Sequence, residues 1–145
     1  MADHVILGGR KAEILLVEDN LGDELLAFRA FRGGKIPNNF SVAGSAEEAW
    51  SMLKRHGAYT RQNRPDLILL DLNLPKMGGK SLLMLIKEDP ELRSIPVVIM
   101  TSSEAPADVQ RCNTLRADAY IVKPMGLDAF RDVVERIEQL FFSVA

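Results

Sequence analysis

The chain lacks the features of secreted and membrane proteins. Cys112 is its only cysteine, so no internal disulfide bond can form. Its longest uninterrupted apolar runs are about 5 residues, far short of the ~20 that span a membrane. The first residues carry neither the basic stretch nor the sustained apolar segment of a signal peptide. We therefore expect a cytoplasmic protein.

Neither sign of charge predominates in the chain. It has 18 basic and 20 acidic residues and a net charge of −2. This balance argues against general binding to nucleic acid, because such binding depends on a basic surface. The 145 residues, 47% of them hydrophobic, suffice for one domain with a substantial core. We expect residues 1–11 to form a loose N-terminal arm and residues 12–145 a single domain without an output domain.

Short apolar runs alternate with segments of helical periodicity. Leu21, Leu25 and Phe28 show helical spacing, and Ser45 with Glu48 forms the capping-box pattern that begins a helix. The five runs are residues 14–17, 40–43, 67–70, 97–100 and 119–122, of which the second alternates apolar and polar residues as a short strand does. Buried strands that alternate with helices predict an α/β fold, in which helices cover both faces of a parallel sheet.

Polar side chains follow four of the five apolar runs. Glu18 and Asp19 follow the first run, Asp71 the third, Thr101 the fourth and Lys123 the fifth. Because ligands of such sheets lie beyond the carboxyl ends of the strands, we expect these side chains to meet. Taken singly, each acid can be a helix cap and the lysine an ordinary surface residue. Capping does not explain all these positions together.

The chemistry expected at this edge follows from its side chains. Three crowded carboxylates repel one another and require a cation, and oxygen ligands with open coordination positions suit Mg²⁺. Lys123 adds a mobile positive charge and Thr101 a hydroxyl donor. A carboxylate nucleophile in these surroundings is typical of phosphoryl transfer to an aspartate, here Asp71.

The order and type of these motifs resemble the receiver domain of two-component response regulators. The resemblance covers roughly residues 12–142 and rests on Glu18-Asp19, Asp71, Thr101 and Lys123-Pro124. It implies a flavodoxin-like, doubly wound, five-stranded parallel sheet in the order 2-1-3-4-5, with five helices. It also implies a phosphorylation switch that alters contacts between proteins, rather than an enzyme that turns over a small substrate.

The resemblance implies a role for each residue of the site. Asp71 would accept a phosphoryl group from a histidine of a sensor kinase, and Lys123 would contact the phosphoryl oxygens. Mg²⁺ would be held by Glu18, Asp19, Asp71 and the backbone carbonyl of Asn73.

Two further positions match the switch of this family. Thr101 would turn inward to a phosphoryl oxygen, and the ring of Tyr120 would move inward with it. A half-buried core ring is the alternative interpretation of Tyr120. The bond between Lys123 and Pro124 would be cis, an isomer that proline makes accessible.

Other segments resemble the stand-alone regulators that are paired with phytochrome-type histidine kinases. They are the segment from Asp71 to Lys76, the polar loop before Pro65, and Asp89-Pro90-Glu91-Leu92 before Ile95-Pro96. A sensor histidine kinase, of phytochrome type, is therefore the expected partner, and neither nucleic acid nor a membrane is expected.

The last predicted helix, from Leu127 to about Phe142, has a wide apolar face. A heptad-like seam is formed by Leu127, Phe130, Val134, Ile137 and Phe141, and it is widened by Val133 and Leu140. The excess apolar surface predicts a homodimer through this helix, the fourth helix and the fifth strand. A wider packed face within the domain is the alternative.

Three other functions fit parts of the pattern. A hydrolase of the haloacid-dehalogenase type needs a second acid where Asn73 stands, and a cap insert that no segment is long enough to supply. A flavodoxin-like electron carrier needs a phosphate loop after its first strand, where Glu18 and Asp19 would repel phosphate. A degenerate receiver would act by protein contact without phosphorylation, but this chain retains every site residue.

Overall fold

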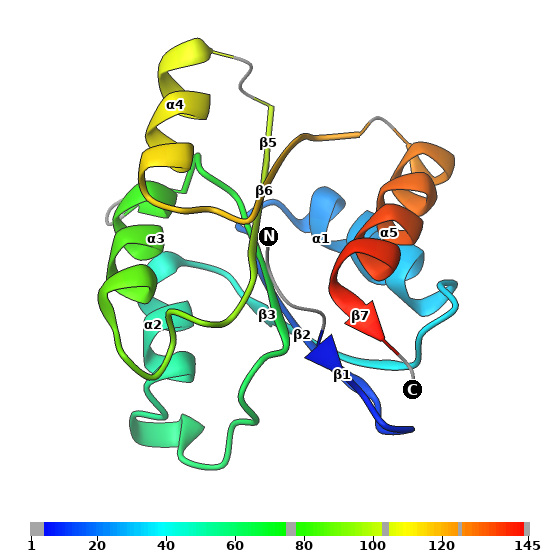
Figure 1. Cartoon of the computed structure of the whole chain (residues 1–145), viewed down its shortest axis with the longest axis horizontal. Coiled ribbons are helices and arrows are strands. Elements are labelled where there is room, and N and C mark those ends of the chain that lie inside the picture. Colours follow the sequence, from blue (N-terminus) through cyan, green and yellow to red (C-terminus); the bar gives the residue numbers. More distant parts are fainter. Residues whose placement is uncertain (1–4, 75–77, 103–104, 125, 144–145) are drawn as a thin grey trace.

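A parallel sheet covered by helices on both faces forms the body of the protein (Figure 1). The computed structural model describes residues 5–74, 78–102, 105–124 and 126–143. Pro75 and Lys76, part of the segment that resembles phytochrome-linked regulators, lie outside these ranges. In the described ranges, every helix is too short or too polar to cross a membrane.

Five strands form the main sheet in the order β3-β2-β4-β5-β6, and each neighbouring pair is parallel. The strands are β2 (Ala12–Val17), β3 (Asn38–Ala43), β4 (Leu67–Leu70), β5 (Val97–Thr101) and β6 (Ala119–Val122). Counted from β2, this is the expected order 2-1-3-4-5, so the predicted fold is confirmed. The central strand β4 is completely buried, which explains why its sequence is apolar without interruption.

Five α-helices of the described residues cover the two faces of the sheet. Figure 1 shows α1 (Leu21–Arg32) and α5 (Leu127–Phe141) on one face, and α2 (Ala46–Leu53), α3 (Gly78–Glu88) and α4 (Pro106–Thr114) on the other. A short 3₁₀ helix, η1 (Gly57–Tyr59), follows α2. Successive residues of β2 point to opposite faces, so Leu15 and Leu16 belong to two separate hydrophobic cores.

Helix α2 begins with the predicted capping interaction. The Ser45 hydroxyl accepts a hydrogen bond from the Glu48 backbone N–H at 3.0 Å. The Glu48 carboxylate accepts a hydrogen bond from the backbone N–H of Gly44 at 2.7 Å. In the usual capping box this side chain bonds the N–H of the N-cap residue, which here is Ser45, one position later.

Helix α1 forms as predicted, but its most apolar stripe faces outward. Leu21, Leu25 and Phe28 are 66%, 47% and 40% exposed. The buried side of α1 is instead made of Ala27, Ala30 and Phe31. The periodicity therefore located the helix, while small side chains and one aromatic ring on another side provide its contact with the core.

The two ends of the described chain pair with each other. β1 (Val5–Ile6) lies parallel to β7 (Phe142–Ser143), and the Leu7 N–H donates to the Ser143 carbonyl at 2.9 Å. Leu7 and Phe142 are buried in the core between the sheet and helices α1 and α5. The arm is thus not loose from Val5 onward, because burial of its apolar side chains holds it against the domain.

Most of the apolar seam of α5 packs inside the domain. Its buried members are Phe130, Val134, Ile137 and Phe141, while Leu127 and Val133 are partly buried. Leu140 remains 51% exposed. Of the two side chains that widen the seam, Val133 therefore belongs to a wider packed face, while Leu140 does not.

Candidate functional site

Three carboxylates meet at the carboxyl edge of the sheet. Glu18 and Asp19 follow β2 and Asp71 follows β4, and backbone hydrogen bonds anchor both segments to neighbouring strands. One carboxylate oxygen of each residue lies within 4.8 Å of those of the other two. Glu18 and Asp71 are buried and Asp19 is exposed. A cluster of carboxylate oxygens with one open side suits a divalent cation that keeps some of its waters.

Lys123 lies directly against this acid cluster. Its backbone N–H donates to the Thr101 carbonyl at 2.7 Å, which fixes the loop that follows β6. Its Nζ lies 2.9 Å from Glu18 and 3.1 Å from Asp71. The predicted meeting of the acids and the lysine is therefore confirmed.

A carboxylate outside this cluster, that of Asp23, also contacts Lys123. It lies in the first turn of α1, and its Oδ2 is 2.7 Å from Nζ of Lys123. Burial by itself would lower the pKa of Lys123, but hydrogen bonds to Asp23, Glu18 and Asp71 raise it above its ordinary value. Lys123 is thus a permanent cation at neutral pH.

The environment of Glu18 favours its neutral form. Burial raises the pKa of Glu18 to about 7, the Lys123 ammonium opposes that rise, and the negative charge of Asp71 adds to it. Glu18 lines a small cavity together with Asp71 and Lys123, and the apolar residues in its other walls keep water from the Glu18 carboxyl. They comprise Leu16, Ala27, Met100, Pro124 and Phe130. A cation placed among the acids would favour the ionised carboxylate instead.

Asn73 links the acid to the hydroxyl. Its backbone N–H donates to Oδ1 of Asp71 at 3.0 Å, and its side-chain amide donates to Oγ1 of Thr101 at 3.0 Å. Thr101 is completely buried at the end of β5. The sequence pointed to the Asn73 carbonyl, and the structure adds its amide as a bridge between Asp71 and Thr101.

The two remaining predictions concern Tyr120, on β6, and the peptide bond between Lys123 and Pro124, just after it. Tyr120 is partly buried and packs against the core on the side of α2, α3 and α4. No peptide bond between described residues is cis, so the Lys123–Pro124 bond is trans, contrary to expectation. The trans isomer is intrinsically favoured by about 0.5–1 kcal/mol, and Lys123 reaches its carboxylates with it.

Gly79 allows α3 to begin close to the acceptor. A Cβ at this position would lie 2.3 Å from the Asp71 carbonyl oxygen and 2.7 Å from the Leu72 Cα. Both neighbours are backbone atoms, so a side chain at residue 79 would displace the loop that carries Asp71. Gly79 is the second residue of α3, and this close approach explains why a residue without a Cβ stands there.

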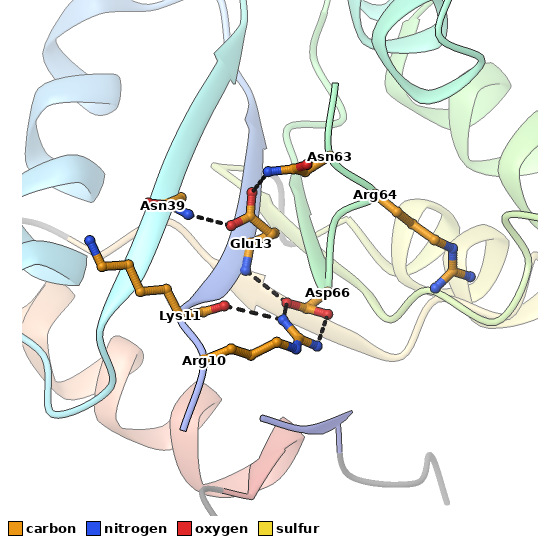
Figure 2. Close-up of a pocket in the computed structure, with 7 residues that line it drawn as sticks. All are labelled: Arg10, Lys11, Glu13, Asn39, Asn63, Arg64 and Asp66. Atoms are coloured by element: carbon orange, nitrogen blue, oxygen red, sulfur yellow. Dashed lines mark hydrogen bonds and ion pairs between the residues drawn. The ribbon is translucent and has the colours of Figure 1, made fainter. Parts of the chain in front are cut away.

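A larger cavity lies at the opposite, amino-terminal edge of the sheet (Figure 2). It has a volume of about 650 Å³, and both of its acidic side chains accept hydrogen bonds from other residues of its lining. Arg10 forms a two-pronged ion pair with Asp66 at 2.7 and 2.8 Å, and Glu13 accepts hydrogen bonds from Asn39 and Asn63. These bonds tie β2 to its neighbours, so the candidate site is the acid cluster rather than this larger cavity.

Comparison with known proteins agrees with this geometry. Residues 14–135 match the family model of the response regulator receiver domain. The chain is 36% identical over 128 residues to response regulator Rcp1 of Synechocystis sp., an alignment that covers 88% of this chain and 87% of that protein.

Solved structures give the same result. The phosphorylated cyanobacterial phytochrome response regulator RcpA superposes with a TM-score of 0.86 at 38% identity, over 93% of this chain and 96% of that one. The Mn²⁺-bound form of Rcp1 superposes with a TM-score of 0.82 at 36% identity, over 89% and 93% of the two chains. The family match, the fold and the acid cluster with its lysine lead to one conclusion: this chain belongs to the response regulator receiver domains.

Proposed function

We propose that this receiver domain accepts a phosphoryl group on Asp71 from a phosphohistidine of a sensor histidine kinase, and signals through altered protein contacts. The observation that carries the proposal is the position of Lys123, 3.1 Å from the carboxylate of a buried Asp71 and beside two further acids. Capping or surface solvation would not require a lysine at the centre of an acid cluster. A role limited to protein contacts, as in a degenerate receiver, would not require it either.

In the proposed transfer, a carboxylate oxygen of Asp71 forms a bond to phosphorus while the bond from phosphorus to the histidine nitrogen breaks. The imidazole keeps the electron pair of that bond. Oδ1 of Asp71 is oriented by the Asn73 N–H, and Lys123 faces Oδ2. Asn73 thus orients the acceptor carboxylate and Lys123 supplies positive charge beside it. Orientation and electrostatic stabilisation supply most of the catalysis in phosphoryl transfer. The phosphorylated aspartate is the signal, so we propose a phosphoacceptor and not a turnover enzyme.

The cation proposed for the site is Mg²⁺. Glu18, Asp19 and Asp71 offer the oxygen ligands that this ion prefers, and the backbone carbonyl of Asn73 is the fourth proposed ligand. The bound Mn²⁺ of Rcp1 supports a divalent cation in a related protein. When bound, the ion would neutralise charge on the phosphoryl oxygens.

Thr101 and Tyr120 are the proposed switch. Thr101 is already within hydrogen-bond distance of Asn73, next to the acceptor, and Tyr120 lies one strand away on the partly buried surface of β6. The Asn73 amide donates to the Thr101 oxygen, whereas a phosphoryl group would offer the Thr101 hydroxyl a charged acceptor, and so bias a two-state equilibrium of this region.

The proposal is tested by incubating the protein with Mg²⁺ and acetyl phosphate, followed by intact-mass measurement. The expected product is an acid-stable, base-labile adduct of one phosphoryl group, about 80 Da. Asp71→Asn should abolish the adduct, while the matched change Asp89→Asn, on the side of the molecule near α3, should leave it intact. An unmodified wild type, or an undiminished adduct on Asp71→Asn, would overturn the proposal.

The proposed phosphodonor is a phytochrome-type sensor kinase, supported by the likeness to RcpA. The exposed stripe of Leu21, Leu25 and Phe28 is the proposed contact, because α1 begins two residues after Asp19 and a kinase must approach that edge. Leu25→Asp should slow transfer from such a kinase but not phosphorylation by acetyl phosphate. The control Ile6→Asp, at an exposed position of β1, should change neither rate, and equal effects of the two variants on transfer would contradict this contact.

We also propose a cytoplasmic homodimer through α5, α4 and β6. The structure supports this interface less than the sequence did, because most of the α5 seam is buried within the domain. Among the described residues of these elements, the large apolar side chains that remain exposed are Val122, at 41%, and Leu140. Size-exclusion chromatography with light scattering at micromolar protein tests the dimer. A single species with the mass of one chain would refute it.

A further inference from the structure

Lys123 is held from two directions. An ammonium group has three N–H donors, and three carboxylates surround this one. Glu18 and Asp71 approach it from the strand ends, at 2.9 and 3.1 Å, whereas Asp23 approaches from α1 at 2.7 Å, the shortest of the three contacts. Asp23 is neither a proposed metal ligand nor the acceptor, so the proposed function gives it no role.

Asp23 is well placed to act as a fixed anchor. Its backbone N–H donates to Oδ1 of Asn20 at 3.0 Å, which closes the first turn of α1. One turn later Ala27 is buried against the sheet, so this end of the helix is packed in place. The N-terminus of a helix also favours a negative side chain. The Asp23–Lys123 contact therefore ties the loop after β6 to the first turn of α1, 100 residues away in the sequence.

We propose that Asp23 is a positioning residue that aims the ammonium of Lys123 at the acceptor oxygen of Asp71. The inference rests on the proposed function. The lysine side chain is long and flexible, so a second fixed contact restricts where its charge lies. When Asp71 becomes an acyl phosphate it loses its carboxylate charge, and the donor that faced Asp71 turns to a phosphoryl oxygen. Asp23 and Glu18 keep the other two donors, so the ammonium does not have to relocate during the transfer.

The primary test compares the rate of phosphorylation by acetyl phosphate, with Mg²⁺, in three variants. Asp23→Asn should slow the reaction about tenfold, since loss of positioning at a reacting centre is costly. Asp23→Glu keeps the charge and should restore part of the rate. Glu24→Gln removes a charge from the same helical turn and should change the rate less than about twofold. Thermal unfolding of each variant verifies that it is folded.

A double-mutant comparison separates positioning from a structural role. If Asp23 acts through Lys123, Asp23→Asn should have no further effect in a Lys123→Gln background. Equal slowing in both backgrounds, or slowing that Asp23→Glu does not relieve, would overturn the inference. A wild type that forms no adduct would refute the proposed function itself. A phosphorylated wild type with an unchanged Asp23→Asn rate would refute only the role of Asp23.

Discussion

Replacement of Glu18 by Gln should remove a pH dependence from the free energy of unfolding. In the metal-free folded protein the pKa of Glu18 is about 7, against an ordinary value of 4.5. A raised carboxyl pKa means that the folded state binds a proton more tightly than the unfolded state. This contribution to stability is therefore complete below about pH 4.5 and is lost as the pH rises through about 7.

The size of the effect follows from those two values. At 1.36 kcal/mol for each pKa unit, the difference corresponds to about 3 kcal/mol, an order-of-magnitude figure for a side chain that is 4% exposed. Gln carries no charge at any pH, so Glu18→Gln lacks this dependence. Between about pH 4.5 and 8, the free energy of unfolding of the wild type should fall by about 3 kcal/mol relative to the variant.

Urea unfolding in EDTA at a series of pH values measures this difference. The control Glu91→Gln, at an exposed position, should give a curve parallel to that of the wild type. Added Mg²⁺ should stabilise the wild type more than Glu18→Gln at high pH, because the ionised carboxylate is a proposed ligand. Parallel curves for the wild type and Glu18→Gln would refute the reasoning, since burial would then not perturb this group.

Three other substitutions probe contacts around the site and the core. Gly79→Ala places a Cβ against the Asp71 carbonyl and should cost about 1–3 kcal/mol in urea unfolding, with slower phosphorylation; an unchanged rate would contradict the close approach. Glu138→Ala leaves two backbone N–H groups of the loop before β3 without their carboxylate and should cost about 1–3 kcal/mol, whereas Glu135→Ala should cost little. Phe31→Ala should cost about 3–5 kcal/mol; a loss near zero would mean that its ring is not a core contact.

The sequence was most informative where strands end. A parallel sheet brings the carboxyl ends of its strands to one edge whatever their separation along the chain, so Glu18, Asp71 and Lys123 could be predicted to meet. Asp23 could not, because an acid in the first turn of a helix already has an ordinary explanation in the helix dipole. Only the path of α1 past the loop after β6 brings it to the lysine.

Helical periodicity shows which residues share a side of a helix, but not which side the sheet covers. For α1 the covered side is the one with Ala27 and Ala30, whose small side chains permit close packing, and the larger Leu21 and Leu25 remain outside. The pairing of β1 with β7 was equally hidden, because two-residue strands have no periodicity to detect. The trans bond before Pro124 shows that a family resemblance does not fix every local conformer.

The pairing of β1 with β7 also has a mechanical consequence. The two strands are parallel, so the amino end of β1 and the carboxyl end of β7 lie at opposite ends of the pair. Tension applied through the two ends of the chain would pull the strands past each other along their length, and would load all of their hydrogen bonds together. This pair of short strands would therefore bear the tension in shear, before the force reaches the main sheet and the carboxylates at the far edge of that sheet.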